Sequence, residues 1–523
     1  MNGDEAQTGR PVESEDDRLR LPALSATRLV MYMANLNRSN FPVERQIGAS
    51  APDATGIVHL GIGQFHRAHA AVNTALAMAE AGGDWGIVGV ANRSRRIIDP
   101  MLNQDFLYSI LQLSPEGTDV QIVDVHRRLF VAAEQPAEVL AAIADPNHKI
   151  VTLTITEKGY NKNGVTGDLM TDSAEIAPGL IGPDQAKAPL AQLAWGLVKR
   201  CHESKAPLTV LSCDNMQSAG NTTKAMVTEF LQAAGVDDNT MSWIAENVSF
   251  PNAMVDRIVP GTNEETKAQV EQILGLRDEA PVPAEAFTMW VLEDHFKAGR
   301  PAWEAAPGVT FSEEVEQYEL VKLRLLNGSH SLISYLGGLS NSPTIPSARD
   351  KEFVEKSVRA AIYHEFLPSI ELPHGFDADA YVAQLFHRWQ NHALGDKTYR
   401  VGSDGSAKLL QRVPEPALRM LNMGQMPHEM ALTTASWIAC VCPPAGFDPG
   451  EIAALMEEPQ RENLAKATAG AKNVHEHAEK IMTGGFFPTE LAEHGEFTDR
   501  VAELLDDIVT HGVEAAAKDA LGE

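Results

Sequence analysis

Apolar and polar positions follow two different spacings over residues 56–96, and the change of spacing predicts local structure. Residues 56–63 (GIVHLGIG) are a β-branched apolar run that closes on glycines, which is typical of a buried strand. The alanine-rich segment that follows has helical spacing and ends at Gly82–Gly83. A second apolar run, WGIVGV, starts at residue 85. The order strand, helix, strand predicts the beginning of a parallel sheet.

Further apolar runs predict additional strands at residues 120–125 (VQIVDV), 149–157 (KIVTLTITE) and 207–212 (PLTVLS). The last two are continuous enough for burial on both faces of a sheet. Residues 192–204 have the spacing of a crossover helix between them. From about residue 312 the strand-like runs nearly vanish, and helical spacing dominates to the end of the chain.

The helical spacing is clearest near the end of the chain. Within residues 497–512 one stripe of a helix carries the apolar side chains, namely Val501, Leu504, Leu505, Ile508 and Val509. We therefore predict the fold class α/β, with a Rossmann-type NAD(P)-binding domain at 51–311 and a mostly α-helical C-terminal domain at 312–523. Residues 1–50 are predicted to be an acidic disordered leader and arm.

Composition narrows the class of protein. The formal net charge of −28 argues against nucleic acid and anionic membranes as partners, and mildly against an anionic substrate. No apolar run approaches the ~20 residues that span a bilayer, and the acidic N-terminus does not resemble a signal peptide. We therefore expect a cytoplasmic protein. Its four cysteines do not make a disulfide framework, and Cys440 and Cys442, in an apolar stretch, are expected to be packing residues. No CxxC or HExxH motif is present, which argues against zinc.

A glycine turn stands between the first strand and the first helix. Gly61 would allow the tight turn, and Gly63 would let a pyrophosphate approach the backbone. His66 holds the place of the third glycine, so a plain strand–turn–helix is the alternative reading. We predict Gly61, Gly63, Phe65 and His66 as cofactor-binding residues.

The end of the second strand decides between the two nicotinamide cofactors. An acidic residue there favours NAD, whereas an arginine can accommodate the 2′-phosphate of NADP. Here the strand continues into Asn92 and Arg93, within ANRSRR, and no acidic residue follows. Asn92 and Arg93 are therefore predicted to contact the cofactor, and both NAD and NADP stay open. A solvated surface loop is the alternative.

Residues 322–330 (KLRLLNGSH) place a lysine, an asparagine and a histidine in a leucine-rich helix. Relative to Lys322, Asn327 lies about 140° and His330 about 80° around a helix of ~3.6 residues per turn, so all three can face one cavity. A lysine in a dry pocket can act as a general base, and an asparagine amide can stabilise an alkoxide. The alternative is an amphipathic helix with a solvated polar face.

The chain resembles the long-chain polyol dehydrogenase family, which contains mannitol 2-dehydrogenase and the hexuronate reductases. The resemblance is collinear from about Ile57 to Arg412. It rests on the blocks VHLGIGQFHRAH, TLTITEKGYN, LSCDN, FPNAMVDRIVP, WVLEDHF, KLRLLNGSH and DGSAK. These blocks stand in the family's order, which makes them far more specific together than any one alone.

The resemblance implies roles for individual residues. Lys322 matches the family's general base, Asn327 and Asn215 its two oxyanion asparagines, and His330 its substrate-positioning histidine. Glu157 of TEKGY matches the gate through which the base exchanges its proton with solvent.

The resemblance also implies substrate contacts at Asp256, Arg400 and Lys408. The chain departs from the family at Ala219, where an asparagine is common, and at the missing acidic residue after the second strand. No metal is expected, since the family uses none and the histidines near the glycine turn lack carboxylate or cysteine ligands at a suitable spacing.

The function predicted from the sequence is an NAD(P)-dependent enzyme that interconverts a linear polyol and its 2-keto sugar, with mannitol and fructose as the leading pair. A hexuronate reductase, which converts fructuronate to mannonate, is the alternative. A dinucleotide-binding sensor or scaffold without catalysis is an alternative of another class. The only partner expected is the small-molecule polyol or keto sugar, and the protein is expected to be a monomer or a small homo-oligomer.

Overall fold

The computed structural model describes residues 33–164 and 166–523. Residues 1–32 of the predicted leader and arm lie outside the described residues. The remaining part of the predicted arm packs along the N-terminal domain. Leu36 is buried there, and its N–H donates to the carbonyl oxygen of Arg277. The N–H of Ile47 likewise donates to the carbonyl oxygen of Ile122.

The N-terminal domain is built on a parallel sheet of six strands in the order β5-β2-β1-β6-β7-β8. Its strands are β1 (Thr55–Leu60), β2 (Gly86–Ala91), β5 (His126–Val131), β6 (Ile150–Leu153), β7 (Leu208–Ser212) and β8 (Val248–Ser249). Numbered along the chain within this sheet, the order is 3-2-1-4-5-6, which is the dinucleotide-binding order with its switch point between β1 and β6. The predicted fold class therefore agrees with the strand topology.

Helices cover both faces of this sheet, as its continuous apolar runs require. Ile57 of β1 packs with the cluster that includes α2, whereas Val58 and Leu60 pack with the cluster that includes α4, α7 and α8. The helices of this domain are α1 (Gln64–Ala68), α2 (Ala70–Ala81), α3 (Ile98–Asn103), α4 (Pro136–Ala144), α5 (Thr156–Gly159), α6 (Ala177–Ile181), α7 (Pro189–Glu203), α8 (Ala219–Ala233), α9 (Asp238–Asn247) and α10 (Glu264–Leu274).

Two small sheets complete the domain. One has the order β10-β3-β4 and the other β12-β11-β9. Their strands are β3 (Tyr108–Ser114), β4 (Gly117–Val123), β9 (Ala253–Asp256), β10 (Val282–Glu285), β11 (Met289–Leu292) and β12 (Val309–Phe311). The predicted strand at 120–125 thus belongs to the antiparallel β3–β4 hairpin and not to the parallel sheet. The first half of β4 is exposed, which an antiparallel hairpin tolerates.

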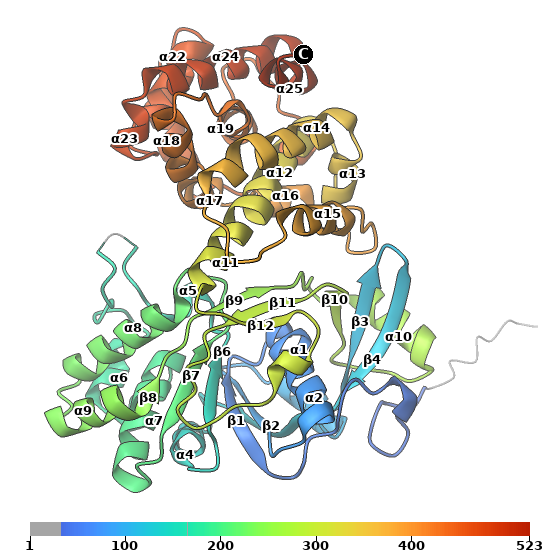
Figure 1. Cartoon of the computed structure of the whole chain (residues 1–523), viewed down its shortest axis with the longest axis vertical. Coiled ribbons are helices and arrows are strands. Elements are labelled where there is room, and N and C mark those ends of the chain that lie inside the picture. Colours follow the sequence, from blue (N-terminus) through green and yellow to red (C-terminus); the bar gives the residue numbers. More distant parts are fainter. Residues whose placement is uncertain (1–32, 165) are drawn as a thin grey trace, which may run out of the picture.

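The helical domain follows β12, and one long helical segment runs into it from the N-terminal domain (Figure 1). This segment consists of α11 (Val315–Val321), the π-helix η4 (Lys322–Gly328) and α12 (Ser329–Leu339). The other helices are α13 (Ile345–Arg349), α14 (Glu352–Ala360), the π-helix η5 (Ala361–Phe366), α15 (Ala378–Arg388), α16 (Thr398–Gly402), α17 (Gly405–Arg412), α18 (Pro414–Asn422), α19 (His428–Val441), α20 (Glu451–Ala454), α21 (Arg461–Thr468), α22 (Val474–Met482), α23 (Thr489–Ala492), α24 (Gly495–His511) and α25 (Val513–Leu521).

The helical domain has a core of its own, to which α12, α19, α24 and α25 contribute. Short 3-10 turns at Val43–Arg45, Pro183–Gln185, Trp303–Ala305 and Leu367–Ser369 complete the secondary structure. Among the described residues, no helix is long and apolar enough to span a membrane.

Candidate active site

The glycine turn lies at the switch point of the parallel sheet. Gly61 has φ +97°, and a Cβ there would lie 2.2 Å from the carbonyl oxygen of Thr154, so this position requires glycine. A Cβ on Gly63 would meet nothing closer than 3.6 Å, which leaves open space beside the first turn of α1. The turn therefore fits a pyrophosphate that approaches the backbone at Gly63.

The rings that follow the turn point in different directions. The ring of His66 is buried, stacks on His59 with 3.3 Å between ring centroids, and lies with Nε2 3.2 Å from Nε2 of His126. Because this ring faces the interior, only the backbone of His66 is placed to contact a cofactor. Phe65 is half-buried and stacks on His69 at 4.9 Å.

The arginines after β2 lie on the surface. Asn92 is half-buried, whereas Arg93 is exposed and pairs with Glu175 at 3.1 Å. Arg95 pairs with Glu134 at 2.7 Å. Glu175 would compete with a 2′-phosphate for Arg93, so both cofactors stay open.

A π-helical turn carries the polar residues of KLRLLNGSH. Lys322 and Asn327 lie at the two ends of η4, five positions apart, which is the hydrogen-bonding interval of a π-helix. The helix is therefore not regular here, as the predicted angle of about 140° assumed. Lys322 and Asn327 line the same cavity, together with Asn215.

Lys322 is buried and held by two oxygen acceptors. Its Nζ donates to Oδ1 of Asn215 and to the carbonyl oxygen of Val255, both at 2.6 Å. Burial lowers the pKa of Lys322 below its usual value, and the negative charge of Asp256 opposes that shift. Among the described residues, no carboxylate lies within 4.0 Å of the Lys322 amine, whose two hydrogen-bond acceptors are both neutral amide oxygens.

Two neighbouring side chains, Arg412 and Trp389, bond the other two polar residues of the KLRLLNGSH segment. Arg412 donates from Nη1 to the carbonyl oxygen of Asn327 at 2.9 Å, which leaves the side-chain amide of Asn327 available. Trp389 donates from Nε1 to Nε2 of His330 at 2.8 Å. Because an indole N–H can only donate, this bond assigns the ring proton of neutral His330 to Nδ1. Burial lowers the pKa of His330 to about 3, so the ring is neutral.

Two carboxyl groups, Glu157 and Glu319, line the cavities around Lys322 and differ in burial. Glu157, at the start of α5, is exposed and lines a cavity of about 390 Å³ that also reaches Asn215. Glu319 is buried and lines the cavity of Lys322 itself, which is about 60 Å³. Burial raises the pKa of Glu319 to about 7. Met216 lines both cavities, so the two are neighbours.

Asp256 is held in a buried ion-pair network. Arg388 contacts both oxygens of Asp256, at 2.8 and 3.0 Å, and also pairs with Glu285 at 2.8 Å. Burial acts to raise the pKa of Asp256, but the charges of Arg388 and Lys322 hold it below its usual value. Asp256 therefore stays charged near Lys322.

The two predicted cations of the 400–408 segment lie apart from the cavity of Lys322. Arg400 is exposed, and Lys408 donates to the carbonyl oxygens of Val401 and Ser403, at 3.0 and 2.6 Å. Burial lowers the pKa of Lys408 to about 8. Neither side chain lines the cavity, so their contact with substrate stays a prediction.

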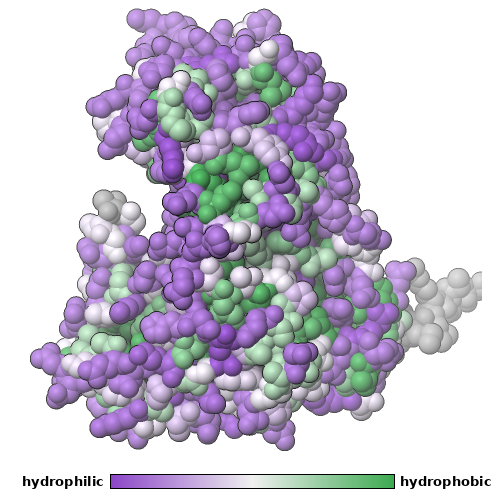
Figure 2. All heavy atoms as spheres, in the orientation of Figure 1, coloured by the Kyte–Doolittle hydropathy of each residue, from purple (hydrophilic) through white to green (hydrophobic). Residues whose placement is uncertain are grey.

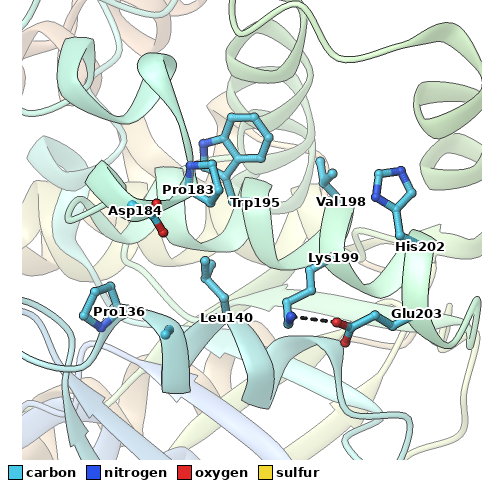
Figure 3. Close-up of a pocket in the computed structure, with 10 residues that line it drawn as sticks. Pro136, Leu140, Pro183, Asp184, Trp195, Val198, Lys199, His202 and Glu203 are labelled. Atoms are coloured by element: carbon cyan, nitrogen blue, oxygen red, sulfur yellow. Dashed lines mark hydrogen bonds and ion pairs between the residues drawn. The ribbon is translucent and has the colours of Figure 1, made fainter.

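The site lies where the two domains meet. Figure 2 shows a recess between them, with hydrophobic side chains of the helical domain gathered beside it. Another cleft, of about 640 Å³, lies within the N-terminal domain (Figure 3). It is lined mainly by α4 and α7, with Trp195 and the Lys199–Glu203 ion pair, and contains none of the predicted site residues.

Several residues of the site were missed from the sequence. Asp214 and Glu319 stand beside predicted residues, Asp214 within the LSCDN block and Glu319 three positions before Lys322, so their proximity was a usable signal. Arg388, Trp389 and Arg412 come from distant helices and have no such signal. Across residues 33–164 and 166–523, no group of three or more His, Cys, Asp or Glu side chains is placed to hold a metal ion.

A parallel dinucleotide-binding sheet, a glycine turn and a buried lysine between two asparagines define a dehydrogenase of two domains. The family model described as the mannitol dehydrogenase Rossmann domain matches residues 55–305, and that of the mannitol dehydrogenase C-terminal domain matches residues 314–509. The chain belongs to the mannitol dehydrogenase family and is thus an oxidoreductase. The family and fold class predicted from the sequence are confirmed.

Relatives in this family carry different substrate names. A D-mannonate oxidoreductase of Escherichia coli is 32% identical over 92% of this chain and 98% of its own length. A mannitol dehydrogenase of Saccharomyces cerevisiae is also 32% identical, over 98% of this chain and 100% of its own. The solved ternary complex of Pseudomonas fluorescens mannitol 2-dehydrogenase with NAD and D-mannitol has a TM-score of 0.78 and 30% identity, and covers 94% of this chain and 100% of its own.

Proposed function

We propose that this protein interconverts a linear polyol and its 2-keto sugar with NAD or NADP, without a metal, and that mannitol and fructose are the leading pair. The observation that carries the proposal is the buried amine of Lys322, which bonds Asn215 and shares its cavity with Asn327. A base and two amides around one cavity are what removal of an alcohol proton requires.

Each protein group has a distinct task in this reaction. Lys322, with its pKa lowered by burial, takes the proton of the C2 hydroxyl as the neutral amine. Since Oδ1 of Asn215 accepts from Lys322, its NH₂ group is free to donate to the substrate oxygen as negative charge grows there. Asn327 donates from the other side, and Nδ1–H of His330 orients a neighbouring hydroxyl. Gly61 and Gly63 would hold the pyrophosphate of the cofactor, whose nicotinamide ring would supply the acceptor for the hydride.

The proton must then leave the buried amine. We predict Glu157 as the exit, since it is exposed and lines the neighbouring cavity. Glu319 is a second candidate, because it lines the cavity of Lys322 and its charge acts on that lysine. Glu157→Gln and Glu319→Gln separate them. The variant at the true exit should show a lower kcat, with a larger solvent isotope effect, and an unchanged Kd for the cofactor.

A substrate panel tests the proposal. D-mannitol, D-sorbitol and D-mannonate are offered with NAD and with NADP, and kcat/KM is measured for each pair. The proposal predicts the highest value for a polyol. The highest value for mannonate would instead favour the hexuronate alternative, which the resemblance to a D-mannonate oxidoreductase supports. No turnover of any pair would contradict both.

Arg93→Ala in the same panel tests the cofactor choice. If Arg93 binds a 2′-phosphate, the variant should lose kcat/KM with NADP by about tenfold and keep its activity with NAD, because only NADP carries that charge. A strong preference for NAD that survives the substitution would contradict a role for Arg93.

A further inference from the structure

The corner between β6 and α5 holds an unfavourable backbone conformation. Thr156 has φ +64°, in the left-handed region that β-branched residues avoid. Such a conformation persists only where its surroundings determine it. The next residue along the chain is Glu157, so whatever holds Thr156 also sets the position of the Glu157 carboxylate.

Asp214 holds this corner. Its carboxylate accepts from the N–H of Thr156 at 2.8 Å, from the N–H of Ile155 at 3.1 Å and from the hydroxyl of Tyr160 at 2.8 Å. Tyr160 is fully buried and its hydroxyl also lies 2.7 Å from Oγ of Ser212, at the end of β7. Three donors from residues 155–160, the segment that follows β6 and contains α5, thus converge on one side chain just after β7.

The same loop carries an oxyanion residue. Asn215 follows Asp214 directly and bonds Lys322, as described above. Asp214 lines the cavity of Lys322, and Glu157 and Tyr160 line the neighbouring one. A displacement of Asp214 would therefore move the proton exit and the oxyanion amide relative to each other.

We propose that Asp214 is a positioning residue that fixes Glu157 and Asn215 as one unit by holding Thr156 in its left-handed conformation. The proposal rests on the proposed function, since that function gives Glu157 and Asn215 their roles. Asp214 itself touches no reacting atom in this account.

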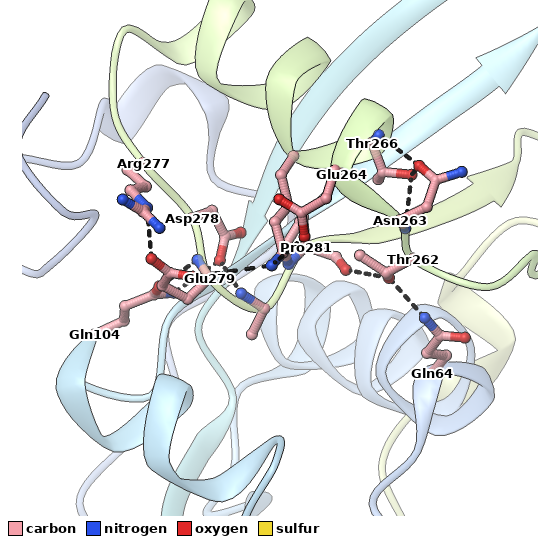
Figure 4. Close-up of polar contacts among 12 residues, drawn as sticks. Gln64, Gln104, Thr262, Asn263, Glu264, Thr266, Arg277, Asp278, Glu279 and Pro281 are labelled. Carbon is pink, nitrogen blue, oxygen red and sulfur yellow. Dashed lines mark hydrogen bonds and ion pairs between the residues drawn. The ribbon is translucent and has the colours of Figure 1, made fainter. Parts of the chain in front are cut away.

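A purely structural role is the competing explanation, and Asp278 is a matched control for it. Asp278 is also a buried aspartate, and it accepts from the N–H and Oγ of Ser109, from Nε2 of Gln104 and from the N–H of Ala280. Asp278 lies in the loop that joins α10 to β10, and Gln104, which bonds it, directly follows α3 (Figure 4). Asp278→Asn should lower Tm by a similar amount but change kcat less than about twofold.

The test is a double-mutant cycle on Asp214→Asn and Thr156→Gly, with kcat and KM measured on the best substrate of the panel. Asp214→Asn should lower kcat about 10- to 100-fold with KM changed less than about threefold, because misplaced groups slow the reacting step. Glycine adopts the left-handed conformation without strain, so Thr156→Gly should restore at least about fivefold of kcat in the Asp214→Asn background. Tyr160→Phe, which removes one donor only, serves if Asp214→Asn does not fold.

Hydrogen exchange at residues 154–160 gives a readout that needs no activity. Exchange there should rise at least about tenfold in Asp214→Asn, and the rise should be smaller in the double variant. Unchanged exchange, or a kcat loss that Thr156→Gly does not alter, would overturn the proposal. An inactive wild type with the expected exchange pattern would count against the proposed function and leave the positioning of the corner supported.

Discussion

Neighbouring side chains set the tautomer, the charge or the orientation of single residues in this site. The N–H of Trp389 fixes the tautomer of His330, and the charge of Arg388 keeps Asp256 ionised. The amine of Lys322 fixes the orientation of the Asn215 amide. In each case a neighbour from a distant element fixes the orientation or the charge of the group.

The tautomer of His330 leads to a prediction at this scale. Trp389→Phe keeps an aromatic ring but removes the donor to Nε2 of His330. Loss of one such hydrogen bond, worth about 1 kcal/mol, should raise KM for the polyol about fivefold, because His330 no longer presents a fixed Nδ1–H. Steady-state kinetics check this. Trp437→Phe is the matched control, since its Nε1 donates to Glu458 elsewhere in the same domain. Equal KM values for both variants would contradict the assignment.

The residues of the site were predictable from the sequence only where they lie in local blocks. Lys322, Asn327 and His330 could be predicted because one short segment carries them, and Glu157 and Asn215 because each lies in a block of the family. Arg388 gave no signal, because its meaning depends on Asp256, which lies 132 positions away.

At the scale of elements, the site depends on the π-helical turn η4. The hydrogen-bonding interval of this turn places Lys322 and Asn327 together, and η5 packs against it. Gly328 makes this close packing possible, since a Cβ there would lie 2.7 Å from the ring of Phe366.

Gly328→Ala therefore tests the turn. The added methyl group should push η4 away from η5, lower Tm and reduce kcat about tenfold or more, because Lys322 and Asn327 would move. Phe366→Leu should recover part of this loss in the double variant. Gly495→Ala is the control, because a Cβ there meets nothing within 4 Å. A Gly328→Ala enzyme with normal kcat would show that the exact path of η4 does not matter.

The elements themselves were predictable to different degrees. Long apolar runs identified β1, β2, β6 and β7, because strands buried on both faces leave a continuous pattern. The short strands β9 and β11 were missed, since four residues carry too little pattern. The π-turn was also missed, because a search at 3.6 residues per turn assumes a regular helix.

At the scale of the whole molecule, the two domains complete one site. Lys322 comes from the helical segment that enters the second domain, while Asn215 and Val255 come from the first.

The N-terminal domain also contains buried histidines on either side of the glycine turn in the sequence. Burial lowers the pKa of His59 and of His69 to about 3.

These histidines make stability depend on pH. The folded state keeps His69 neutral, but the unfolded chain binds a proton there below about pH 6.5, so stability falls as pH drops through the window from 6.5 to 3. At pH 5 the loss from one such group is about 2 kcal/mol. Glu365, whose pKa is raised to about 8 by burial, acts in the opposite direction. A variant is therefore needed to isolate the histidine.

His69→Phe should remove this contribution. Measured by denaturant unfolding, the difference in unfolding free energy between wild type and variant should shift by about 2 kcal/mol in favour of the variant between pH 7.5 and pH 5. A difference that is independent of pH would mean that His69 does not stay neutral in the folded protein.

The central claim is that Lys322 is the general base, and chemical rescue of Lys322→Ala tests it most directly. We predict that Lys322→Ala lowers kcat/KM for polyol oxidation by about 10² to 10⁴, and that added small primary amines restore part of it. In the wild type, kcat/KM should rise with pH with an apparent pKa below 10.5, since burial lowers the pKa of Lys322. A Lys322→Ala enzyme that keeps wild-type turnover, or that no amine rescues, would contradict the claim.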